Sequence, residues 1–173
     1  MTDSPTVDVL GTIWHADRTE RTPLGRLVEA AKDRDDDAAV ALLAAEMQAW
    51  VATGGVAVDP TAIVVGIPAS PDRPNRLVPA VARALAGAAG AAYDDAVVRH
   101  TATVRLRELP PEARPTMVAA ADYEVVGGVD GRAVVLVDDV VLSGATLGHV
   151  AELLRDAGAG SVHLVALARS RRG

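Results

Sequence analysis

The stretch Ala133-Val-Val-Leu-Val-Asp138-Asp139-Val-Val-Leu-Ser143-Gly144-Ala145-Thr146 decides the fold class, because it joins a buried strand, two adjacent carboxylates and a loop of small residues. Residues 133 to 137 form a continuous apolar run rich in valine, which is typical of a strand buried on both faces of a parallel sheet. The two acids therefore stand at the carboxyl end of that strand. In open α/β sheets ligands bind at this edge, where helix amino-termini point toward the ligand.

The segment that follows the acids has the composition of a phosphate-binding loop. It offers two hydroxyls and several backbone N–H groups before a helix that is marked by the spacing of Leu147, Val150 and Leu154. The first turn of a helix has unpaired N–H donors and a partial positive charge, which suit a dianionic phosphate. Two carboxylates would repel a phosphate that had no other group near it. We therefore expect the carboxylates to bind sugar hydroxyls and Mg²⁺.

This segment resembles the phosphoribosyl-pyrophosphate (PRPP) signature of type I phosphoribosyltransferases: four apolar residues, two acids, then a small loop that ends in Gly-x-Thr. The resemblance implies that Asp138 and Asp139 hold the ribose hydroxyls and the metal, Mg²⁺. It also implies a loop for the 5-phosphate, made of Leu142, Ser143, Gly144, Ala145 and Thr146. Many purine-salvage members have a carboxylate where this chain has Leu142, so a 6-oxopurine acceptor is disfavoured.

A second loop follows the apolar run 62–67, which predicts another buried strand. Pro68, Ala69 and Ser70 lead from it into a polar segment and then a helix that carries Leu77, Val81, Ala84 and Leu85 on one side. One interpretation is an ordinary strand-to-helix turn, for which serine and proline are usual. The resemblance implies instead the loop that binds pyrophosphate, with charge added by Arg73 or Arg76.

The proline-bearing segment 100–115 contains three arginines, at positions 105, 107 and 114. The resemblance implies a hood that closes over pyrophosphate near this point, and Arg105 is our candidate for the closing cation. The alternative is an extended hairpin whose arginines face solvent. The fold expected from the resemblance is α/β: a central, mostly parallel sheet flanked by helices, with a small hood from the N-terminus and the 100–125 region.

Weaker patterns complete the predicted secondary structure. A helix should start at Thr22, with Pro23 in its first turn, and the acidic run 33–37 should end it and cap the next helix, 38–51. Residues 7–14 predict a short peripheral strand, and residues 96–99 and 123–126 predict an antiparallel pair. Residues 162–167 predict the last strand.

Composition narrows the class of protein. The 173 residues are expected to form one domain, 1–173, whose core is built from small aliphatic side chains, since phenylalanine is absent. A net charge of -6 without a basic stripe argues against nucleic acid as a partner. No apolar run is long enough for a membrane span, and the absence of cysteine is compatible with a reducing cytosol, so we expect a cytoplasmic protein.

Secondary matches, among them the run from Thr22 to Leu27 and the run from Ala166 to Arg169, are similar to the ComF group of phosphoribosyltransferase relatives. Members commonly begin with a cysteine-rich zinc ribbon, which this chain lacks. The resemblance implies a PRPP-dependent glycosyltransferase, a homodimer that acts on a small heterocyclic acceptor, nucleobase-like or deazapurine-like. Trp14, His15 or Tyr123 could stack on the acceptor ring, although core packing is the more usual role.

Two other functions remain open from the sequence. The fold could bind PRPP or a nucleotide as a regulator without catalysis, which Leu142 favours. The acid pair could instead belong to a phosphoryl receiver or a simple metal site at a strand end. A receiver has no need for Ser-Gly-Ala-Thr directly after its acids, so the loop favours PRPP.

Overall fold

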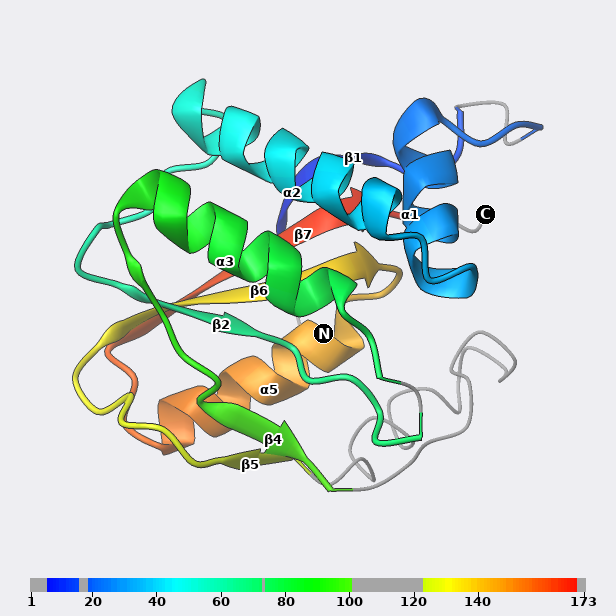
Figure 1. Cartoon of the computed structure of the whole chain (residues 1–173). Helices are drawn as coiled ribbons and strands as arrows, with labels where there is room; N and C mark the ends of the chain where they lie inside the picture. The colour runs from blue at the N-terminus through cyan, green and yellow to red at the C-terminus, as the bar shows by residue number, and fades with distance from the viewer. Residues whose placement is uncertain (1–5, 16–18, 73, 101–122, 171–173) are drawn as a thin grey trace.

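The computed structural model describes residues 6–15, 19–72, 74–100 and 123–170, which fold around a five-stranded sheet. The strands lie in the order β1-β7-β6-β2-β3, and every neighbouring pair is parallel (Figure 1). Their bounds are β1 Asp8–Thr12, β2 Ile63–Gly66, β3 Ala92–Tyr93, β6 Ala133–Val141 and β7 Ser161–Arg169. The predicted parallel α/β architecture is confirmed.

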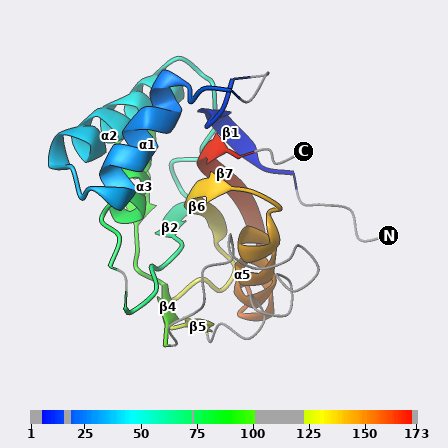
Figure 2. The same ribbon diagram turned by 90° about the vertical axis from the view of Figure 1, so that its right-hand side faces the viewer.

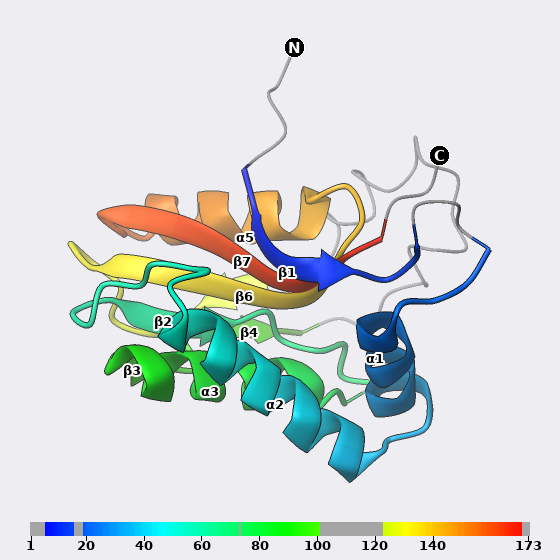
Figure 3. The same cartoon turned by 90° about the horizontal axis from the view of Figure 1, so that it is seen from above.

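Helices cover both faces of the sheet. On one face lie α1 Pro23–Asp33, α2 Asp37–Ala52 and α3 Leu77–Ala89, and on the other lies α5 Ala145–Asp156 (Figure 3). The first two begin where local chemistry predicts. Thr22 accepts a hydrogen bond from the Gly25 amide, and Asp36 accepts from the first amides of α2. No helix in the described ranges is both long and apolar enough to cross a bilayer.

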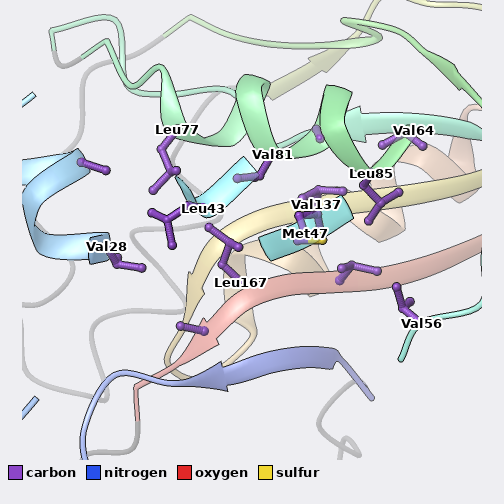
Figure 4. Close-up of a cluster of buried hydrophobic side chains, with 14 of the residues drawn as sticks. Val28, Leu43, Met47, Val56, Val64, Leu77, Val81, Leu85, Val137 and Leu167 are labelled. Carbon is purple, nitrogen blue, oxygen red and sulfur yellow. The ribbon is translucent and has the colours of Figure 1, made fainter. Parts of the chain in front are cut away.

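Two apolar clusters hold these layers together. The larger lies between the sheet and α1, α2 and α3, and Figure 4 labels ten of its side chains, including Leu43, Met47, Val81 and Leu167. The smaller lies between the sheet and α5, where Leu136 and Leu154 are fully buried. Figure 2 shows the sheet edge-on between the two helical layers. The core therefore contains no phenylalanine and is filled by closely packed Ala, Val and Leu side chains.

One prediction about the strands is confirmed, and one strand was missed. The strand predicted in residues 7–14 is β1, which pairs with β7 and lies at the periphery of the central sheet as its edge strand. The strand after α3 in the central sheet is β3, which the sequence did not reveal because its two residues show no periodicity.

The predicted antiparallel pair is confirmed. It consists of β4 Val97–Arg99 and β5 Tyr123–Val125, which form a separate two-stranded sheet below α5 in Figure 1. The segment expected to form the hood, including Arg105, falls largely in 101–122, which lies outside the described residues.

Candidate functional site

The acid pair lies where β2 leaves β6. The register of β2 on β6 ends with Gly66 opposite Val137, and the Ile67 amide then donates to the Val137 carbonyl at 2.8 Å. Strand β6 itself continues to Val141 beside β7, so Asp138 and Asp139 lie within the strand rather than after its end. The pair therefore occupies a step in the sheet, at its carboxyl side, with the loop from β2 beside it.

Strand alternation sends the two carboxylates to opposite faces of the sheet. Asp139 follows Val137 toward α1, α2 and α3, and it is only 5% exposed. Its Oδ2 lies 2.7 Å from Lys32 Nζ at the end of α1 and accepts a hydrogen bond from Asn75 Nδ2 at 2.8 Å. The Asn75 side chain also accepts from the Leu77 amide, which ties the start of α3 to the acid.

Lys32 and Asn75 are site residues that the motif did not predict. Lys32 is the only lysine in the sequence, and it lies next to the apolar face of α1. The sequence therefore did contain one signal that singles it out. Burial lowers the pKa of Lys32, but the negative charges of Asp139, Asp138 and Asp33 outweigh burial and leave the pKa raised. The lysine therefore faces the acids as a cation.

Asp138 lies in a different environment. Burial, and next the negative charge of Asp139, raise the pKa of Asp138 from 3.8 to about 7, against the opposing effects of Lys32 and of the hydrogen bond from the Asp139 amide. That amide donates to Asp138 Oδ1 at 2.8 Å. The two acids thus differ: Asp139 is held by the Lys32 ammonium and the Asn75 side-chain amide, whereas Asp138 is costly to ionise.

The loop after the acids begins helix α5 without a side-chain cap. Gly144 is the N-cap and adopts a left-handed conformation, with φ of 78°. Ser143 Oγ accepts from the Ala145 amide at 3.3 Å, and no side-chain hydrogen bond is recorded at the cap itself in the described part of the chain. Such a first turn presents N–H groups and a partial positive charge to an anion.

The second predicted loop leaves the sheet at the same edge, next to the acid pair. Pro68, Ala69 and Ser70 are half-buried and follow directly after the bond between Ile67 and Val137. The Ser70 hydroxyl donates to Asp72. The structure thus brings both sequence-predicted loops to one edge of the sheet.

The structure describes only one of the two arginines that were expected to add positive charge to this loop. Arg76 forms ion pairs with Asp35 in the turn between α1 and α2 at 2.8 Å and with Asp37, the first residue of α2, at 2.9 Å. Arg73 lies outside the described residues, as does Arg105. Among the described residues, Lys32 is therefore the cation that contacts the acid pair directly.

The three aromatic candidates do not form one cluster, since Tyr123 lies on β5 and the neighbouring residues Trp14 and His15 follow β1. Tyr123 packs edge-on to His149 of α5 with ring centroids 6.1 Å apart, and Arg99 lies over its ring at 5.5 Å. Burial raises the pKa of Tyr123, and the charge of Asp138 adds to the rise. Trp14 instead packs on the core with Arg21 over its ring, and His15 is exposed.

The donor set fits a metal ion carried by a substrate better than one held by protein alone. Mg²⁺ prefers six oxygen ligands. One oxygen of Asp139 already bonds Lys32 and Asn75, and the described residues contain no group of three or more acidic, His or Cys side chains placed to hold a metal. A magnesium ion here would take most of its ligands from a bound molecule and from water.

Comparison with known proteins gives one family and a small set of relatives. The sequence model of the family described as "Phosphoribosyl transferase domain" matches residues 76–173. A protein of Lactococcus lactis subsp. lactis (strain IL1403) named "Putative ribose-phosphate pyrophosphokinase 2" is 33% identical over 86 aligned residues, which cover 42% of this chain and 26% of that protein.

Two solved structures share the fold at 25% identity and a TM-score of 0.52. One is described as the allosteric regulatory enzyme of purine biosynthesis, and the other as the glutamine PRPP amidotransferase from B. subtilis complexed with ADP and GMP. Each match covers 74% of this chain and 26% of the other. The chain therefore spans about a quarter of the length of these relatives.

Proposed function

Because the chain belongs to the phosphoribosyl transferase domain family, we propose that it is a PRPP-dependent phosphoribosyltransferase. It transfers 5-phosphoribosyl from PRPP to a nitrogen of a small heterocycle and releases pyrophosphate. The observation that carries the proposal is the sheet step at Asp138 and Asp139, followed directly by the uncapped start of α5. A diol and a phosphate on one sugar match these two features.

Each of the three parts of the proposed substrate has its own binding region. The acids hold the ribose 2- and 3-hydroxyls, since carboxylates accept hydrogen bonds from vicinal hydroxyls. The 5-phosphate lies on the loop made of Leu142, Ser143, Gly144, Ala145 and Thr146. The pyrophosphate lies against Pro68, Ala69 and Ser70. Asp138 and Asp139 would be the protein carboxylates that hold Mg²⁺ together with PRPP, and the ion would neutralise charge on the phosphates.

Some of these residues contribute mainly to binding of the substrate, and others mainly to the rate of the reaction. As the bond from C1 to pyrophosphate loosens, positive charge grows on the sugar and negative charge grows on the leaving group. Fixed amides of the 68–70 loop and an arginine such as Arg105 stabilise the leaving group, which lowers the barrier. Asp138, Asp139 and the α5 loop hold the sugar in place, which contributes through orientation.

A second candidate function rests on Leu142. A leucine at this position cannot exchange a proton with an acceptor, so the protein could bind PRPP as a regulator without turnover. Within the family we further propose the ComF-like group, a homodimer, and a cytoplasmic location, all of which rest on the sequence resemblance and composition.

A pyrophosphate-release screen tests the enzymatic proposal. PRPP with Mg²⁺ is incubated with purines, deazapurines, pyrimidines and simple aromatic acids, and the double variant Asp138→Asn/Asp139→Asn is the control. We expect one acceptor class to release pyrophosphate with wild-type protein and not with the variant. Calorimetric binding of PRPP without release for any acceptor favours the regulator, and absence of binding contradicts both functions.

A further inference from the structure

The carboxylate of Asp139 is held by side chains that lie outside the signature. Lys32 Nζ lies 2.7 Å from Asp139 Oδ2, and Asn75 donates to the same oxygen at 2.8 Å. The side chain of Asp139 is 7% exposed and that of Lys32 is 36% exposed. The ammonium of the partly exposed Lys32 thus contacts a nearly buried carboxylate. One oxygen of Asp139 is therefore already bonded to Lys32 and Asn75 in the absence of a sugar.

We propose that Lys32 is a positioning residue of the diol site: it holds Asp139 in one orientation and offsets one of the two negative charges that the phosphates of PRPP meet there. This inference rests on the proposed function, because it gives Lys32 a role in PRPP binding. It adds a residue from α1 to a site that the motif builds from β6 and α5 alone.

Helix α1 is built to hold the lysine in place. Thr22 caps its start, and the Gly25 amide donates to the Thr22 hydroxyl at 2.9 Å. Val28 and Ala31 bury the inner face of the helix in the core. Lys32 therefore extends from a helix whose rotation is fixed, and its ammonium is delivered to the acid by the fold rather than by a flexible loop.

The charge argument favours the same role. Adjacent carboxylates repel an anionic ligand, and a cation in contact with one of them reduces that repulsion. Arg76, another described cation near this edge, is engaged by Asp35 and Asp37. Lys32 is thus suited to compensate the negative charge of the acids through its contact with Asp139.

The first test compares two charge changes at the same end of α1. Lys32→Met removes the ammonium, and Arg34→Met removes an exposed arginine two residues later. Calorimetry with PRPP and Mg²⁺ should show affinity about tenfold lower for Lys32→Met, on the scale of a lost charged hydrogen bond, and nearly unchanged for Arg34→Met. Lys32→Arg should recover most of the affinity. Equal losses in the two methionine variants would overturn the proposal.

A double variant tests whether the lysine acts through the acid. If it does, Lys32→Met adds little to the loss that Asp139→Asn causes alone, because the contact is already gone. Independent, multiplying losses would instead overturn the positioning role. Wild-type protein that binds no PRPP contradicts the proposed function, whereas normal binding by Lys32→Met contradicts this inference alone.

Chemical labelling tests the same idea on the wild-type protein, so it does not depend on a variant that folds. Lys32 is the only lysine, so an amine-acetylating reagent has one side-chain target, and the N-terminal amine is an internal reference. Bound PRPP with Mg²⁺ should slow acetylation of Lys32, measured by mass spectrometry of its peptide, and leave the reference unchanged. An unchanged rate at a PRPP concentration that saturates binding would overturn the proposal.

Discussion

Asp138 should weaken the fold at neutral pH, because its surroundings disfavour the charged carboxylate. Its pKa is raised from 3.8 to about 7, first by burial and next by Asp139. The unfolded chain releases this proton near pH 4, so between pH 4 and 7 the folded protein holds more protons than the unfolded chain. The free energy of unfolding therefore falls as pH rises through this window and stays low above it.

The magnitude follows from the shift. The cost is on the order of a few kcal/mol above pH 7, because burial and the charge of Asp139 both oppose ionisation of Asp138. Asp138→Asn removes the charge but keeps an oxygen to accept the Asp139 amide, which donates at 2.8 Å in the wild type. The variant should therefore be more stable than wild type at pH 8 and about equally stable at pH 4.

Urea unfolding followed by circular dichroism at pH 4, 6 and 8 measures this difference. Glu152→Gln, which removes an exposed charge from α5, is the matched control and should follow the wild-type pH dependence. The same Asp138→Asn protein should lose PRPP affinity in calorimetry. A variant that is no more stable than wild type at pH 8 would refute the reasoning that burial penalises this charge.

Four other changes extend the test. Asp139→Asn leaves the Lys32 cation without its carboxylate and should destabilise the fold by about 1–3 kcal/mol at pH 7, opposite in sign to the change at Asp138. Gly144→Ala forces a side chain into a left-handed conformation and should cost about 1–2 kcal/mol and weaken binding of PRPP, whereas Gly128→Ala, which has open space, should do neither. Leu136→Ala in the fully buried centre of β6 should lower stability by about 2–5 kcal/mol in denaturant titration. Gly25→Ala places Cβ 2.1 Å from a backbone carbonyl oxygen, so we expect a lower Tm and weaker PRPP binding because α1 is displaced.

Local chemistry made most of the fold predictable from sequence. The valine-rich run of β6, the threonine cap of α1 and the aspartate cap of α2 act through neighbours in the chain, so their signals are short and readable. The two-residue β3 has no such signal. Its place in the sheet depends on pairing with β2, which is a tertiary contact.

The sequence by itself determined that two acids and a small loop follow a buried strand, because that order is written along one continuous segment. Only the tertiary structure decided what surrounds them. Lys32 and Asn75 reach Asp139 from distant elements, and Arg76 turns away to Asp35 and Asp37. The physical reason is that a charged side chain pairs with the groups that tertiary packing places within about 3 Å of it. The spacing of residues along the sequence does not determine that distance.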